Sequence, residues 1–228
     1  MQKESTPAVP EKDQLVEILE KAMAFAKANR DKVLLGVSGG VLLLAIITGL
    51  GLYNQKAGRD ASIAFQAVKT DFQAVVEREG RDIALTRWMA DAPSVLGNLK
   101  GGGSSYGAAL LWYGGLAFET GDYESAATWY GGAAGEFGSD SSLRNIAWCG
   151  QGQALEQQGK PVEAAPLYEK IRKSESSVKL YEAVFHLARI KEVQGDTEGA
   201  ALLYREIMES GTASSYKALA EEKVAGLH

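Results

Sequence analysis

The chain has few of the side chains from which catalytic and metal sites are built. Its 228 residues include one cysteine, Cys149, and two histidines, His186 and His228. One thiol cannot close a disulfide within the chain, and these three residues lie too far apart in sequence to show a zinc-ligand spacing. A phosphate-binding loop, a nucleophile elbow and a zinc-protease motif are also missing. We therefore expect no enzymatic activity, no cofactor and no metal site.

Basic residues are scarce relative to acidic ones. The formal net charge is −5, and residues 1–53 carry six basic and six acidic side chains, so the excess negative charge falls in residues 54–228. An acidic domain without a basic stripe argues against nucleic acid as a partner. Because no catalytic groups cluster, we also expect no small-molecule substrate. Proline is rare, at 5 residues, and alanine and glycine are frequent, which favours an all-α fold of closely packed helices.

One long apolar run stands out. Val33 to Tyr53 covers 21 residues without a charge, twelve of them Val, Leu or Ile. As a helix this run is roughly 31 Å long, which matches the hydrocarbon core of a bilayer. Residues 33–53 are therefore predicted to be a transmembrane helix in contact with lipid, with a buried helix of a soluble domain as the alternative. Asn54, Gln55 and Lys56 follow without a cleavage site, which indicates an uncleaved signal anchor.

The charges that flank this run predict its orientation. Four basic residues lie shortly before it and two shortly after it: Lys21, Lys27, Arg30 and Lys32, then Lys56 and Arg59. The positive-inside rule then places the N-terminus in the cytoplasm and the C-terminal domain outside. Gly36 and Gly40 form a G-x-x-x-G pair, which suits close contact with another transmembrane helix, although such pairs also arise by chance.

The cytoplasmic segment is expected to cover residues 1–32. Residues 1–12 are polar and contain two prolines, so they are predicted to be a disordered tail. Asp13 can cap an amphipathic helix whose apolar residues recur at helical spacing: Leu15, Ile18, Leu19, Ala22, Met23 and Ala26. This helix could lie on the membrane surface, contact a partner or form a short stem, and the sequence leaves these three open.

Residues 54–100 are predicted to form a membrane-proximal helical hairpin. A helix from Ala61 to Glu79 is followed by Gly80 as a break and by a short helix from Ile83 to Ala90. The stretch from Gly97 to Tyr106, with three glycines in succession, is predicted to be a flexible loop.

A repeat follows the loop. Gly121, Gly159 and Gly195 lie 38 and 36 residues apart, and each is a predicted turn. A small residue stands seven positions before each glycine, an alanine five after it and a tyrosine four further on: Gly114, Gly152 and Ala188, then Ala126, Ala164 and Ala200, then Tyr130, Tyr168 and Tyr204. This phase resembles the tetratricopeptide repeat, whose unit is about 34 residues. It predicts repeats over 107–140, 145–178 and 181–213, with a capping helix over 214–228.

The order of elements resembles one family in particular. A single uncleaved anchor, the run RDASIAFQAV after it and degenerate repeats to the C-terminus are similar to the YfgM-like family of ancillary SecYEG translocon subunits. The resemblance implies a bacterial inner-membrane protein with a periplasmic domain. It also implies translocon subunits, periplasmic chaperones and unfolded or exported polypeptides as partners. A tetratricopeptide adaptor for cell division, cytochrome assembly or outer-membrane assembly is the alternative.

The first helix of each repeat is expected to line a concave protein-binding groove. The candidate residues are Leu111, Phe118 and Glu119 in the first repeat, Ile146, Cys149, Gln153 and Glu156 in the second, and Glu182, Phe185, Arg189 and Glu192 in the third. For each apolar member, packing against the next hairpin is an equally good interpretation. Cys149 is interpreted as a packing residue, and an intermolecular disulfide stays open.

Overall fold

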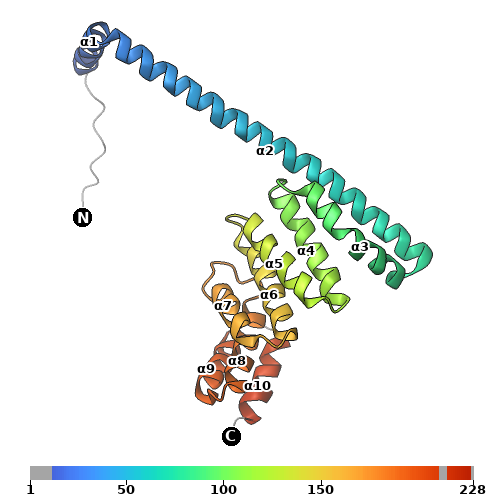
Figure 1. Cartoon of the computed structure of the whole chain (residues 1–228). Coiled ribbons are helices and arrows are strands. Elements are labelled where there is room, and N and C mark those ends of the chain that lie inside the picture. Colours follow the sequence, from blue (N-terminus) through green and yellow to red (C-terminus); the bar gives the residue numbers. More distant parts are fainter. Residues whose placement is uncertain (1–11, 211–214, 227–228) are drawn as a thin grey trace, which may run out of the picture. The chain divides into compact units, whose positions relative to one another are not determined.

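The computed structural model describes residues 12–210 and 215–226, and in that part of the chain every regular element is an α-helix (Figure 1). The prediction of an all-α fold is confirmed. The helices are α1 (Lys12–Ala28), α2 (Arg30–Glu79), α3 (Arg81–Leu99), α4 (Ser104–Glu119), α5 (Tyr123–Glu136), α6 (Ser141–Gln157), α7 (Pro161–Arg172), α8 (Leu180–Val193), α9 (Thr197–Glu209) and α10 (Ser215–Gly226). They belong to two compact units, Met1–Tyr53 and Asn54–His228, which are taken in turn.

The first unit contains α1 and the first part of α2. Helix α1 begins at Lys12, so Asp13 lies in its first turn and not at the cap position where the sequence placed it. The disordered tail was predicted over residues 1–12; Lys12 instead begins α1, and residues 1–11 lie outside the described residues. Gly36 and Gly40 fall within α2, in a stretch whose side-chain surroundings the structure does not describe.

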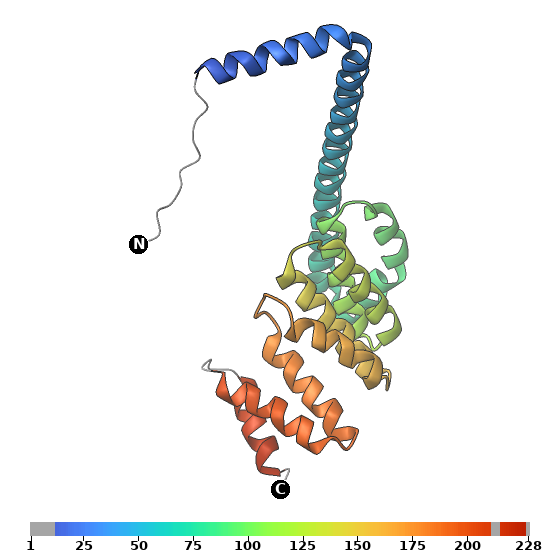
Figure 2. The same cartoon turned by 90° about the vertical axis from the view of Figure 1, so that its left-hand side faces the viewer.

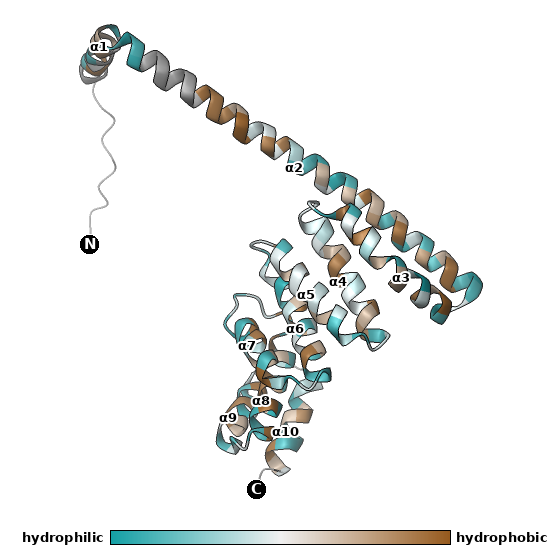
Figure 3. Cartoon of the chain, viewed as in Figure 1, coloured by the Kyte–Doolittle hydropathy of each residue, from teal (hydrophilic) through white to brown (hydrophobic). Residues whose placement is uncertain are grey.

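Helix α2 carries the apolar run (Figure 3). Among the described residues one helical stretch is long and apolar enough to cross a membrane, the part of α2 from Val41 onward. None of its apolar window is buried by the rest of the protein. The chain therefore has one candidate membrane-spanning helix near its N-terminus.

The second unit begins with a hairpin formed by the end of α2 and by α3. Gly80 joins the two helices with φ 94°, a left-handed conformation that glycine adopts without strain. The Phe72 ring packs edge-on against the Trp88 ring, 5.5 Å between centroids.

Helix α3 differs from the sequence prediction. It continues beyond the predicted end at Ala90, through Pro93, to Leu99. The predicted C-terminal end of the short helix and the predicted start of the loop at Gly97 are therefore both wrong. Packing explains the extension, because Leu96 and Leu99 are 5% and 3% exposed and stabilise the helix beyond its proline.

The glycine-rich connection between α3 and α4 is a tight turn. It covers only residues 100–103, since α4 begins at Ser104 and includes Tyr106. Gly101 and Gly103 have φ values of 88° and 56°, and Gly102 is in close contact with Ala61 of α2. The glycines therefore allow a sharp reversal and a close approach, where the sequence suggested flexibility.

Three further hairpins, α4–α5, α6–α7 and α8–α9, follow one another and end with α10 (Figure 2). The glycines at their turns, Gly121, Gly159 and Gly195, have φ values of 80°, 73° and 82°. In the first two hairpins a small residue of the first helix meets a tyrosine ring of the second: a Cβ on Gly152 would lie 2.6 Å from Tyr168 Cζ. The repeated small residues are thus the points where two helices touch.

Candidate protein-binding groove

One surface pocket is shared by the three repeats. Its volume is about 340 Å³, and its walls come from α4, α6 and α8, the first helix of each hairpin. The lining residues are Phe118 from α4, Gln153, Glu156 and Gln157 from α6, and His186 and Arg189 from α8. Four of them were predicted from the sequence to line the groove: Phe118, Gln153, Glu156 and Arg189. We refer to these six residues as the groove pocket.

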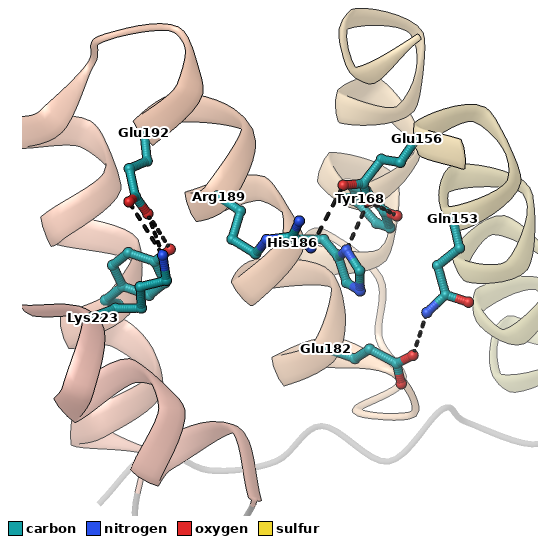
Figure 4. Close-up of polar contacts among 9 residues, drawn as sticks. Gln153, Glu156, Tyr168, Glu182, His186, Arg189, Glu192 and Lys223 are labelled. Atoms are coloured by element: carbon teal, nitrogen blue, oxygen red, sulfur yellow. Dashed lines mark hydrogen bonds and ion pairs between the residues drawn. The ribbon is translucent and has the colours of Figure 1, made fainter. Parts of the chain in front are cut away.

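Glu156 lies at the centre of the polar contacts (Figure 4). Tyr168 donates its hydroxyl hydrogen to Glu156 Oε1 at 2.6 Å. His186 Nδ1 lies 2.7 Å from the same oxygen, and Arg189 Nη1 lies 3.8 Å from Oε2. Burial by itself would raise the pKa of Glu156, but His186, Tyr168 and Arg189 together hold that pKa below its ordinary value. Glu156 is therefore an ionised, well-compensated carboxylate.

Tyr168 supports this carboxylate from inside the domain. Its side chain is fully buried, and its ring stacks on the His186 ring with 5.2 Å between centroids and 19° between planes. Burial, and then the neighbouring Glu156, raise the pKa of Tyr168. The hydroxyl consequently stays protonated and remains a hydrogen-bond donor.

The third repeat has the same arrangement. Tyr204 donates its hydroxyl hydrogen to Glu192 Oε2 at 3.0 Å, and Lys223 Nζ of α10 lies 3.2 Å from the same carboxylate (Figure 4). Burial would raise the pKa of Glu192, but Tyr204 and Lys223 lower it overall. The first repeat lacks the carboxylate, because Phe118 stands twelve residues before Tyr130, where Glu156 and Glu192 stand before their tyrosines. The position twelve residues before the tyrosine is therefore apolar in the first repeat and acidic in the next two.

Glu182 joins the second and third repeats beside the groove pocket. It accepts hydrogen bonds from Gln153 Nε2 at 2.7 Å and from Lys179 Nζ at 2.6 Å. Burial would raise the pKa of Glu182, but these donors, Lys179 foremost, lower it overall. Gln153 is thereby held in place across the boundary between two hairpins.

Two predicted groove residues are in the core. Cys149 is 1% exposed, and burial raises the pKa of its thiol, so the thiol stays protonated and inaccessible. Phe185 is 9% exposed and packs against Tyr204 and Tyr216, with 5.5 Å between ring centroids in both pairs. Assigning them to a groove surface was wrong, because the neighbouring hairpin and α10 cover them.

Three other predicted residues lie away from the groove pocket. Leu111 is partly buried against the core of the α2–α5 region, and Ile146 is partly buried and does not line the pocket. Glu119 binds the guanidinium of Arg81 with two hydrogen bonds, one of them 2.6 Å from Nη2 to Oε2. Glu119 thus connects α4 to α3, outside the shared pocket.

His186 and Gln157 are groove residues that the sequence reasoning missed. His186 lies three residues before Arg189, so both side chains are on one face of α8. Gln157 is exposed and follows Glu156 at the end of α6. Helical spacing from the predicted Arg189 could have found the histidine. In the described part of the chain, no three His, Cys, Asp or Glu side chains are grouped closely enough to hold a metal ion.

A second surface pocket, of about 620 Å³, lies around Trp148. The Arg144 guanidinium and Lys170 Nζ lie 5.3 Å and 5.6 Å from the centroid of the indole ring. Arg144 precedes Gln153 by nine residues, which at about 100° per residue puts it on the opposite side of α6. This basic pocket is therefore separate from the groove pocket.

Replacing Tyr168 with phenylalanine tests the buried hydrogen bond. We expect Tyr168→Phe to lower the free energy of unfolding by about 1 to 2 kcal/mol at pH 7, because Glu156 loses one donor. A carboxylate whose pKa is lower in the folded state contributes stability above its unfolded-state pKa. That contribution is lost as the pH falls through the folded-state pKa. The difference between variant and wild type should therefore shrink below about pH 4. Urea unfolding at both pH values measures it.

The matched control is Tyr123→Phe. Its ring packs on Phe118 at 5.3 Å, and no hydrogen bond of its hydroxyl is found in the described residues. This variant should unfold as the wild type does. Equal losses in both variants would contradict a special role for the Tyr168 hydroxyl.

Comparison with known proteins agrees with the geometry. Residues 99–141 and 149–215 match the family model of the tetratricopeptide repeat, and the matches cover α4, α5, α7, α8, α9 and the second half of α6. A search of curated proteins gave no match to this chain. The hairpins are tetratricopeptide repeats, an architecture that mediates protein–protein interaction through its concave surface.

Proposed function

Starting from a chain whose hairpins are tetratricopeptide repeats, we propose that it is a membrane-anchored adaptor that binds a segment of a partner protein in its groove. The observation that carries this proposal is the pocket shared by α4, α6 and α8. A site built by three successive first helices follows the axis along which solenoid domains hold extended chains.

The groove pocket combines three kinds of contact. Phe118 offers an apolar wall, Gln153 and Gln157 offer amide groups, and Arg189 offers a half-exposed guanidinium. Amides can pair with both the N–H and the C=O groups of an extended backbone. An aliphatic or aromatic side chain of the partner would pack on Phe118. Because His186, Tyr168 and Arg189 already compensate the charge of Glu156, the partner segment would not need a charged side chain at this point.

Anchoring makes weak binding sufficient. Residues 33–53 would hold the repeat domain at the membrane, with the N-terminus in the cytoplasm and the repeats in the periplasm. A tethered domain meets a neighbouring membrane complex at a high effective concentration, so modest affinity in the groove gives substantial occupancy.

The resemblance to YfgM-like proteins supports a more specific role. The chain would be an ancillary subunit of the Sec translocon in a bacterial inner membrane. Its groove would receive exported polypeptides as they emerge, or a segment of a periplasmic chaperone. The physical requirement for either partner is the same, an extended segment with an apolar side chain next to hydrogen-bonding groups.

Crosslinking from the groove tests the proposal. The photoreactive amino acid p-benzoylphenylalanine in place of the exposed Gln157 should capture partner proteins in living cells, and mass spectrometry should identify them. The matched control is the same probe in place of Arg205, an exposed residue of α9 outside the pocket. We expect translocon subunits, chaperones or exported chains at the first position and several-fold less at the second.

Two other results would count against parts of this proposal. Capture of division, cytochrome-assembly or outer-membrane-assembly proteins at Gln157 would keep the adaptor and remove the translocon role. Equal capture at both positions would show that the groove has no special part in binding.

A further inference from the structure

We propose that α1 lies flat in the interface of the membrane leaflet that the anchor enters, with its apolar face in contact with lipid acyl chains. The inference rests on the proposed anchor and adds a second, surface-bound membrane element. Its basis is a set of five large apolar side chains on α1 that are half exposed or more: Val16 50%, Ile18 60%, Leu19 59%, Met23 57% and Phe25 65%.

These side chains share one face. At about 100° per residue, the five occupy roughly half of the helix circumference. From Glu17 onward the charged residues of α1 occupy the other half: Glu17, Glu20, Lys21 and Lys27. Lys21 and Glu17 pair with each other at 2.6 Å on that polar side. The division into an apolar half and a charged half is typical of helices that lie in a bilayer interface.

The chain connection limits how far α1 can be from the membrane. Asn29 alone separates α1 from α2, and both its backbone N–H and its Nδ2 donate to the carbonyl of Phe25, at 3.0 Å and 3.2 Å. The charge-free run begins at Val33, four residues further, or about 6 Å along a helix. The C-terminal end of α1 is therefore within roughly one helix diameter of the hydrocarbon.

The local charge favours a lipid surface. Between residues 21 and 32 the chain carries four basic side chains, Lys21, Lys27, Arg30 and Lys32, against one acidic side chain, Asp31. Headgroups of anionic lipids attract such cations. The width of the apolar face points the same way, because a seam between two helices needs only a narrow stripe, whereas α1 exposes half of its surface.

Site-specific fluorophores on the full chain in lipid vesicles test this placement. In a Cys149→Ala background, Phe25→Cys and Ala24→Cys carry the same environment-sensitive dye on the apolar and the polar side of α1. Vesicles contain phosphatidylethanolamine and phosphatidylglycerol, with a nitroxide on the acyl chains of a fraction of the lipid. The background variant must keep the tryptophan fluorescence of the wild type.

We expect several-fold stronger quenching at residue 25 than at residue 24, with a blue-shifted emission at residue 25. A third dye position, Leu44→Cys, reports the anchor separately. Quenching at residue 44 with none at residue 25 would overturn the surface placement and leave the anchor intact. Loss of quenching at residue 25 when protein is concentrated in the vesicles would show that a second copy covers the face, which also overturns it. Absence of quenching at residue 44 would remove the anchor as well.

Discussion

Gly152→Ala is expected to destabilise the repeat domain by about 1 to 3 kcal/mol, one of the two largest effects we predict for a single substitution. The added Cβ would lie 2.6 Å from Tyr168 Cζ and 2.7 Å from Tyr168 Cε1. The tyrosine ring cannot move away easily, because it is fully buried and its hydroxyl is bound to Glu156. Separating α6 from α7 would also disturb the groove pocket.

The matched control is Gly135→Ala in α5. No heavy atom lies within 4 Å of the Cβ that this change adds, and the residue is exposed. Helix propensity should then stabilise the domain by about 0.5 to 1 kcal/mol. Urea unfolding of the full chain in detergent, followed by tryptophan fluorescence, reports on the second unit, residues 54–228, because all four tryptophans lie in it. Equal effects of the two substitutions would contradict the close helix contact at Gly152.

Asn145→Ala is expected to lower the free energy of unfolding by about 2 to 3 kcal/mol. Asn145 is fully buried in α6, and its Nδ2 lies 2.7 Å from Ser174 Oγ, 3.1 Å from the Ser176 carbonyl and 3.0 Å from the Val178 carbonyl. Truncation leaves three partly buried acceptors of the α7–α8 connection without this donor. The exposed Asn98→Ala in α3 is the control and should change stability little.

The stability of the Asn145→Asp variant is expected to depend on pH. A carboxylate there would face three oxygen atoms, so its pKa in the folded state should rise above the unfolded value of about 3.9. A raised pKa means that the penalty grows as pH rises and largely disappears in acid. The variant should therefore be less stable than Asn145→Ala at pH 7 and approach it at pH 4. A pH-independent difference would contradict the assigned amide orientation.

The repeat could be predicted from the sequence because its signals are local and recur. Each turn needs a residue with positive φ, which favours glycine, and each helix crossing needs a small residue. The same residue types therefore recur at Gly121, Gly159 and Gly195 and seven positions before each of them. Three recurrences in phase indicate stacked hairpins even where the large residues vary. The all-α fold follows from the same periodicity.

The end of α3 could not be predicted in this way. Pro93 and the glycines at 101–103 are residues that usually end a helix, so the sequence pattern predicts a helix end and a loop there. The outcome depended on non-local packing: the second half of α3 buries Leu96 and Leu99, and Gly102 fits against Ala61. These contacts join residues far apart in the chain, and no local pattern records them.

The groove was predicted in part for a related reason. Helical spacing identifies the residues on one side of α6 and α8, and three residues that it selected line the pocket: Gln153, Glu156 and Arg189. Spacing does not show how far the next hairpin extends over that side. Phe185 is covered because Tyr216 of α10 packs on it, and a capping helix has no counterpart in the earlier repeats from which to infer its position.

The order of contacts bears on how this protein can change over evolution. From α4 onward, each helix packs on its neighbours in the chain, and the first helices of the hairpins and α10 also make weaker contacts in the order α4–α6, α6–α8 and α8–α10. A duplicated or deleted hairpin would therefore disturb one junction and leave the others intact. Helix α10 is joined to α8 by the ion pair of Lys223 with Glu192 and by the packing of Tyr216 on Phe185. We therefore expect α8, α9 and α10 to be inherited together when hairpins are gained or lost.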